Sequence, residues 1–134
     1  MAYCKAQKSN PKKIGQDMRE LIESPTRGYD HNYVLNEQKR NKDTGLVLAA
    51  VLTHESGRYL KVYTTLPGLQ VYTGNHLKGQ KTKTGHELAP WQGICLEPQF
   101  FPDSINHKHF PSTVLGPRKE WKHEIIYEFG TNKK

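Results

Sequence analysis

The chain has 134 residues, with 20 Lys and Arg against 13 Asp and Glu, which gives a formal net charge of +7; this length allows one domain with one modest core. The longest apolar run, Leu46 to Leu52, falls far short of the roughly 20 residues that cross a bilayer. Since no charged-then-apolar leader opens the chain, we expect a soluble protein that is not secreted and has no membrane partner.

The N-terminal part of the chain divides into a tail and a helix. Residues 1–11 are polar and basic without periodicity, and we expect them to form a mobile tail ahead of a β domain over residues 12–134. Apolar residues then recur at i, i+4, i+7 and i+8, which predicts a short amphipathic helix that ends before Pro25. These apolar residues are Ile14, Met18, Leu21 and Ile22.

Strand patterns follow Gly28. Residues 32–35 form a short run, and the runs 46–54 and 58–65 are joined by Glu55-Ser56-Gly57, which predicts a β-hairpin. Leu66-Pro67-Gly68-Leu69 carries Pro and Gly at the central positions of a turn, which favours a type II turn before a strand over residues 70–73.

The second half of the chain alternates strands with loops. Residues 91–97 have strand character, and we expect Pro98 to end that strand and open a long irregular connection to Pro117, which is typical of functional loops. A last strand is predicted over residues 121–129, with alternate apolar residues on one face. Six strands separated by turn signals predict an all-β, antiparallel architecture with long irregular loops.

The positive charge is spread along the chain. Residues 1–45 carry nine basic and six acidic side chains, and residues 46–134 carry eleven and seven. No aromatic-interleaved basic stretch or recognition-helix pattern accompanies the charge. We therefore interpret it as a solvated surface and expect no nucleic acid partner.

The cysteines and histidines suggest neither a disulfide nor a metal site. Cys4 and Cys95 lie 91 positions apart without a second cysteine nearby, which is typical of free thiols in the cytoplasm. Cys95, between two apolar residues, is predicted to be a buried small hydrophobe. His107 and His109 could share one side of an extended segment, but no third ligand is indicated, so we expect no metal.

Three longer stretches carry a family resemblance. They are GYDHNYVL over residues 28–35, VYTTLPGLQVYTGN over residues 62–75 and GICLEPQFFPDSIN over residues 93–106. In this order and spacing they resemble the C-terminal part of the aldose 1-epimerase (galactose mutarotase) family. The resemblance implies a truncated antiparallel β-supersandwich and an isomerase of carbohydrate metabolism that interconverts the α and β anomers of hexoses such as galactose and glucose, without a cofactor.

The same resemblance assigns roles to three residues. It places the catalytic base on Glu97 and sugar contacts on Asp30 and Gln70. A carboxylate suits proton removal from the anomeric hydroxyl, and an amide can both donate to and accept from a polyol. Taken without the family, Glu97 could be an ordinary surface residue, Asp30 a turn or cap residue, and Gln70 a cross-sheet pair. A tyrosine or tryptophan could offer an apolar face to the sugar, and the candidates are Tyr29, Tyr72 and Trp91.

The chain departs from the family in one respect. The family's catalytic acid is a histidine in an N-terminal portion that this sequence does not include, and none of the seven histidines matches it. We therefore expect impaired activity, or alternatively a catalytically inactive remnant that binds a sugar or an interaction partner. Inner strand faces left uncovered would favour instability, self-association or pairing with a missing N-terminal half.

Overall fold

The computed structural model describes residues 4–5 and 12–132, which form two β-sheets, one α-helix and two short 3₁₀-helices. The helices are α1 (Ile14–Ile22), η1 (Glu37–Lys39) and η2 (Ser104–Asn106). The strands are β1 (Cys4–Lys5), β2 (Asp30–Val34), β3 (Val47–Thr53), β4 (Arg58–Thr64), β5 (Gly68–Tyr72), β6 (Cys95–Gln99) and β7 (Ile125–Thr131).

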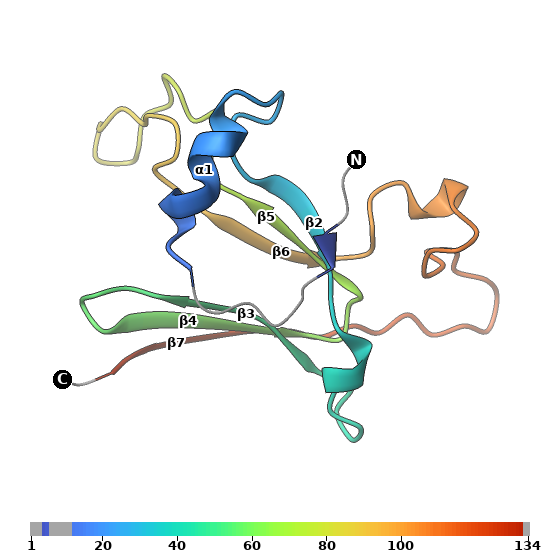
Figure 1. Ribbon diagram of the computed structural model, residues 1–134. Coiled ribbons are helices and arrows are strands. Elements are labelled where there is room, and N and C mark those ends of the chain that lie inside the picture. The colour runs from blue at the N-terminus through green and yellow to red at the C-terminus, as the bar shows by residue number, and fades with distance from the viewer. Residues whose placement is uncertain (1–3, 6–11, 133–134) are drawn as a thin grey trace.

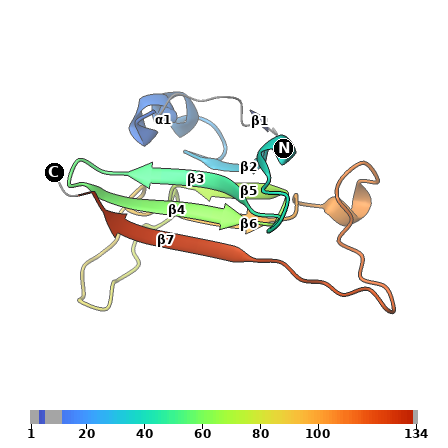
Figure 2. The same cartoon turned by 90° about the horizontal axis from the view of Figure 1, so that it is seen from below.

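The strands form two layers (Figure 1). One sheet has the order β1-β2-β5-β6 and the other has the order β3-β4-β7. The pairs are antiparallel except for the short β1, which runs parallel to β2. Seen from below, the three-stranded sheet lies in front of the four-stranded one (Figure 2). A mostly β, antiparallel fold is thus confirmed.

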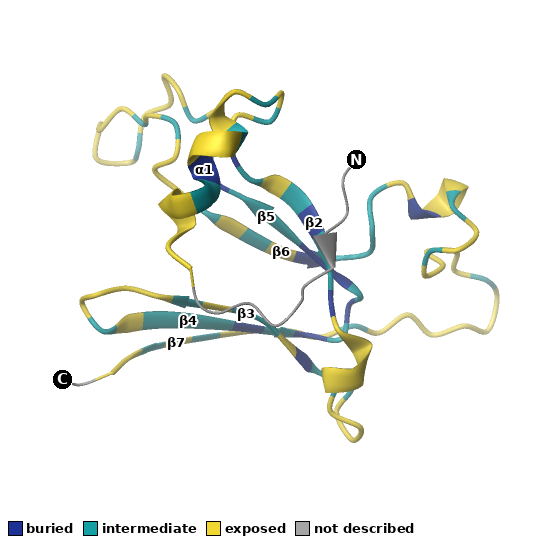
Figure 3. Ribbon diagram, in the orientation of Figure 1, coloured by how far each residue is buried: buried dark blue, intermediate teal, exposed yellow. Residues whose placement is uncertain are grey.

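The core lies between the two sheets. Leu35, Val47 and Leu69 are buried there, and partly buried apolar residues from β3, β5 and β6 pack against them, namely Ala49, Ala50, Val71 and Leu96. Burial is concentrated where the sheets converge, while β7 and the loops are largely exposed (Figure 3). The sandwich therefore has the small core that its composition predicts.

The hairpin and the helix are confirmed. β3 and β4 pair antiparallel, and Gly57 adopts a φ of 83° in the turn between them. Helix α1 ends at Ile22, ahead of Pro25, and buries Met18 from its apolar face.

The predicted type II turn before β5 is wrong. That turn requires a positive φ at Gly68, but Gly68 is absent from the positive-φ glycines and instead begins β5. Its missing side chain makes room for a close contact, because a Cβ there would lie 2.7 Å from Oδ1 of Asn32 and 3.0 Å from the ring of Phe101. The glycine serves packing rather than a turn.

Three further expectations need correction. Pro98 does not end its strand: it pairs with Leu69 inside β6, which is an edge strand, where a proline nitrogen can face away from the ladder. The last strand begins at Ile125, later than predicted, because its pairing with β4 starts there. Cys95 is exposed because it lies on the outward face of β6.

Most of the predicted N-terminal tail lies outside the described residues. Of residues 1–11, only Cys4 and Lys5 are described, and they pair with Tyr33 and Val34 of β2. In the part of the chain that the structure describes, no helix has the length and apolar character of a bilayer-spanning segment.

Candidate functional site

The three predicted site residues lie on one face of the four-stranded sheet. Directly opposed residues of adjacent strands share a face, and the register places Asn32 opposite Gln70 and Gln70 opposite Glu97. Asp30 lies two positions from Asn32 and therefore projects to the same side. The alternate residues of these strands, such as Leu69, point into the core, so this polar face is turned away from the other sheet.

A pocket of about 470 Å³ lies over this face, within the size range of small-molecule sites, about 300–1,000 Å³. Asp30, Gln70 and Glu97 all line it, although the strands that carry them are far apart in the sequence. The rest of the described wall consists of Tyr72, His76, Gln99 and Pro102. The structure therefore brings the three residues together in one cavity.

Asp30 and Gln70 are hydrogen-bonded to each other. Nε2 of Gln70 donates to Oδ1 of Asp30 at 2.6 Å across the β2–β5 ladder. Asp30 and Glu97 are exposed and Gln70 is half-buried, so both carboxylates are open to a ligand that enters from solvent. Asp30 caps none of the described helices, and its carboxylate accepts a hydrogen bond from a pocket residue.

A buried hydrogen-bond network fixes the backbone immediately before Asp30. The amide of Asn75, which is 3% exposed, donates to the carbonyls of Thr26 and Tyr29 at 2.7 and 2.9 Å and accepts a hydrogen bond from the hydroxyl of Thr73. The Thr73 hydroxyl oxygen also accepts from the Tyr29 N–H at 3.1 Å. Because Thr73 follows β5 directly, this network ties the start of β2 to the end of β5.

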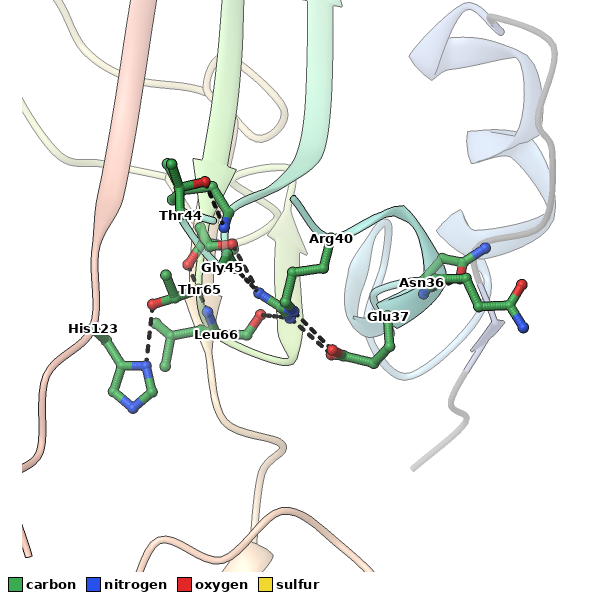
Figure 4. Close-up of polar contacts among 11 residues, drawn as sticks. Asn36, Glu37, Arg40, Thr44, Gly45, Thr65, Leu66 and His123 are labelled. Carbon is green, nitrogen blue, oxygen red and sulfur yellow. Dashed lines mark hydrogen bonds and ion pairs between the residues drawn. The ribbon is translucent and has the colours of Figure 1, made fainter. Parts of the chain in front are cut away.

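At the opposite end of β5, Arg40 fixes the crossover between the sheets (Figure 4). Its guanidinium donates to the carbonyls of Gly45, Thr64 and Leu66 and makes two hydrogen bonds of 2.7 Å to the carboxylate of Glu37. The carbonyls of Thr64 and Leu66 lie where the chain leaves β4 for β5, and that of Gly45 lies just before β3. Arg40 therefore helps to hold the strand that carries Gln70.

The charges of the pocket favour a neutral polar ligand. Its described wall holds two carboxylates, two amides, a phenol, an imidazole and a proline ring, and no Lys or Arg. Such groups can bind several hydroxyls but repel a phosphate or carboxylate. On the core side of the sheet, burial and then the electrostatic effect of Glu97 raise the pKa of Tyr127, whose hydroxyl donates to the Leu96 carbonyl at 2.8 Å.

The three aromatic candidates lie in different places, and three residues of the wall, His76, Gln99 and Pro102, were not among the predicted site residues. Tyr72 lines the pocket, whereas Tyr29 and Trp91 do not belong to its described wall, and the indole N–H of Trp91 donates to the Arg27 carbonyl at 2.8 Å. His76 was missed; its backbone N–H donates to the Tyr72 hydroxyl at 3.1 Å. Its signal was available, because His76 follows the matched TGN sequence directly.

His107 and His109, the two histidines considered as metal ligands, are not part of the described pocket wall. The rings of His107 and His109 are 5.7 Å apart between centroids, and Nε2 of His107 lies 3.2 Å from Oδ2 of Asp103. Among residues 4–5 and 12–132 there is no group of three or more potential metal ligands. The absence of a metal remains a prediction.

Comparison with known proteins identifies similar sequences. The family model for aldose 1-epimerase matches residues 3–128. Galactose mutarotase of Mus musculus is 41% identical over 121 residues, covering 84% of this chain and 34% of the mouse protein. Aldose 1-epimerase of Escherichia coli is 39% identical over 105 residues, covering 77% of this chain and 30% of the bacterial protein. The chain thus spans about a third of the length of these relatives.

Proposed function

This chain belongs to the aldose 1-epimerase family, and on that premise we propose that its pocket binds an aldose such as galactose or glucose. In this proposal Glu97 is the catalytic base, and Asp30 and Gln70 are the sugar contacts. The observation that carries the proposal is that these residues, from three different strands, line one open cavity without Lys or Arg in its described wall.

The reaction is a pair of proton transfers. The Glu97 carboxylate takes the proton of the C1 hydroxyl, the C1–O5 bond breaks, and O5 gains a proton, which leaves an open-chain aldehyde. Rotation about the C1–C2 bond followed by the reverse steps returns the other anomer, with the proton of Glu97 restored to the C1 oxygen. The proposal uses no metal or cofactor.

This chain is less well equipped to protonate O5 than to remove the proton of the C1 hydroxyl. The acid histidine expected from the resemblance is not in this sequence, and His76 is the one imidazole in the described wall. We propose that His76 supplies this proton. No side-chain hydrogen bond to a described residue holds its exposed imidazole in place, so its contribution lies near the low end of the ~10²–10⁴-fold that such steps give.

The two sheets are proposed to form part of the family's supersandwich, with residues 12–134 as the β domain. Support comes from β7, where Ile125, Tyr127 and Phe129 lie on the face shared with the buried Val62 yet are 42%, 44% and 75% exposed. An apolar inner face that is left open is suited to protein contact. The occupant is proposed to be a second copy or a polypeptide that supplies the rest of the family's length.

Sugar binding without catalysis is the second candidate, because the pocket offers more contacts for a sugar than groups for proton transfer. Two measurements separate the candidates: calorimetric titration with galactose and glucose, and the rate of anomer exchange of the same sugars. Binding with exchange supports the isomerase, and binding alone supports the inactive sugar-binding protein. Galactose 6-phosphate is the matched control and is expected to bind more weakly, because two carboxylates line the pocket. Failure of both neutral sugars to bind would contradict the proposal.

A further inference from the structure

Asn32 is a buried amide without a hydrogen-bond partner. It lies on β2 in the same cross-strand row as Gln70 and Glu97, directly opposite Gln70, and is 4% exposed. Neither its Oδ1 nor its Nδ2 makes a hydrogen bond to any described residue, and Oε1 of Gln70, also buried, makes none either. One donor and two acceptors are therefore unsatisfied on the pocket face of the sheet.

Ordinary structural roles do not account for this arrangement. In native proteins about nine in ten or more buried polar groups are paired, because an unpaired one loses its hydration without compensation. Exchanging the amide oxygen and nitrogen of Asn32 would not help, since both are unpaired. The sheet also makes room for the amide through Gly68, whose absent side chain would otherwise collide with Oδ1. An apolar residue at position 32 would avoid the cost.

The chemistry of the unpaired atoms matches one hydroxyl group. A hydroxyl donates one hydrogen bond and accepts others, so it can donate to an amide oxygen of Asn32 or Gln70 while it accepts from Nδ2 of Asn32. Gln70, directly opposite Asn32 in the ladder, lines the pocket, and its Nε2 is bonded to Asp30.

We propose that Asn32 and Gln70 form a subsite for one ring or exocyclic hydroxyl of the aldose, other than the one at C1, and that Asn32 thereby determines specificity among sugars. The proposal rests on the proposed function of the pocket. On this proposal, the unpaired amide of Asn32 lowers the stability of the ligand-free chain because it serves to bind a sugar hydroxyl.

The test uses Asn32→Leu, which removes the amide at similar size, with Asn32→Ala as a second variant should leucine pack poorly. Calorimetry measures the affinity of the wild type and each variant for galactose and for its 2-, 3-, 4- and 6-deoxy analogues. We expect the variant to lose about tenfold in affinity for galactose. One deoxy analogue should bind wild type and variant equally, because it lacks the hydroxyl that the subsite holds.

Thermal unfolding gives a second readout. Asn32→Leu should raise the melting temperature of the ligand-free chain, whereas the matched control Asn36→Leu should lower it without changing affinity, because Asn36 accepts a hydrogen bond from the Gln38 N–H at the start of η1. An affinity loss that is uniform across the deoxy sugars, or no loss, overturns the subsite alone. If the wild type binds none of these sugars, the proposed function fails and the subsite fails with it.

Discussion

The amide of Gln70 donates to the carboxylate of Asp30 at 2.6 Å, so the two predicted sugar contacts are joined across neighbouring strands before any ligand binds. The bond links a residue from the start of β2 to one from the middle of β5. It also orients both groups toward the same cavity. Preorganisation of this kind lowers the cost of ordering side chains upon binding.

This relationship predicts coupling between the two residues. Asp30→Ala and Gln70→Ala should each weaken galactose binding about tenfold, and the double variant should bind more tightly than the product of the two losses, because each single change already removes the shared bond. Calorimetric titration of the four proteins completes the cycle. Losses that multiply fully would show that the bond has no part in binding.

Asn75 is predicted to support the position of Asp30. Asn75→Ala removes two hydrogen bonds to the carbonyls of Thr26 and Tyr29 and should lower the free energy of unfolding by about 1–3 kcal/mol. Urea denaturation measures this loss. Galactose titration should show binding that is reduced in proportion to the fraction of the variant that remains folded. The exposed Asn41, whose side chain accepts hydrogen bonds from the Asp43 and Thr44 N–H groups and does not line the pocket, supplies the control Asn41→Ala, expected to change sugar affinity little.

Arg40 is predicted to be a stabilising residue that lysine cannot replace. One ammonium cannot reproduce the guanidinium's bonds to Glu37 and to the carbonyls of Gly45 and Leu66, so Arg40→Lys should cost about 1–3 kcal/mol in urea unfolding. The exposed pair of Lys12 and Asp17 supplies the contrast: Lys12→Ala should change stability by less than about 1 kcal/mol. Equal effects of the two substitutions would contradict the role given to Arg40.

The lowered pKa values of two carboxylates predict that the folded chain loses stability in acid. Hydrogen bonds from Arg40 lower the pKa of Glu37, and a hydrogen bond from Lys61 lowers the pKa of Glu128. A lowered folded-state pKa means that the folded chain binds fewer protons than the unfolded chain, so this stabilisation is present above pH 4.5 and is lost as the pH falls through the folded-state pKa values.

Urea midpoints measured between pH 7 and pH 3 check this dependence. Glu128→Gln should reduce the acid-induced loss, whereas Glu55→Gln, in the exposed hairpin turn and without an ion pair among the described residues, should leave it unchanged. A midpoint that rises below pH 4.5 would be incompatible with these shifts.

Local patterns predicted the regular elements well. The spacing of Ile14, Met18 and Leu21 sufficed for α1, and the alternation on both sides of Gly57 sufficed for the β3–β4 hairpin, because both depend on near neighbours in the chain. The grouping of Asp30, Gln70 and Glu97 came from the family resemblance. The structure supplies the physical basis, a register that aligns three strands on one face.

The errors arose where distant segments decide the structure. Pro98 fits a strand only because β6 is an edge strand, and Gly68 is needed for its contacts with Asn32 and Phe101. Neither fact is visible in local sequence. His76 joins the pocket because the chain doubles back after Gly74, whose φ of 66° allows that turn.

Polarimetry of freshly dissolved α-D-galactose tests the central claim, that Glu97 removes the anomeric proton in a pocket shared with Asp30 and Gln70. The wild-type chain should accelerate the change in rotation above the buffer rate, though less than the full-length mouse relative. Glu97→Gln should return the rate to that of buffer while galactose still binds, and His76→Gln should lower it only in part. A Glu97→Gln chain that accelerates the reaction as well as the wild type would contradict the account.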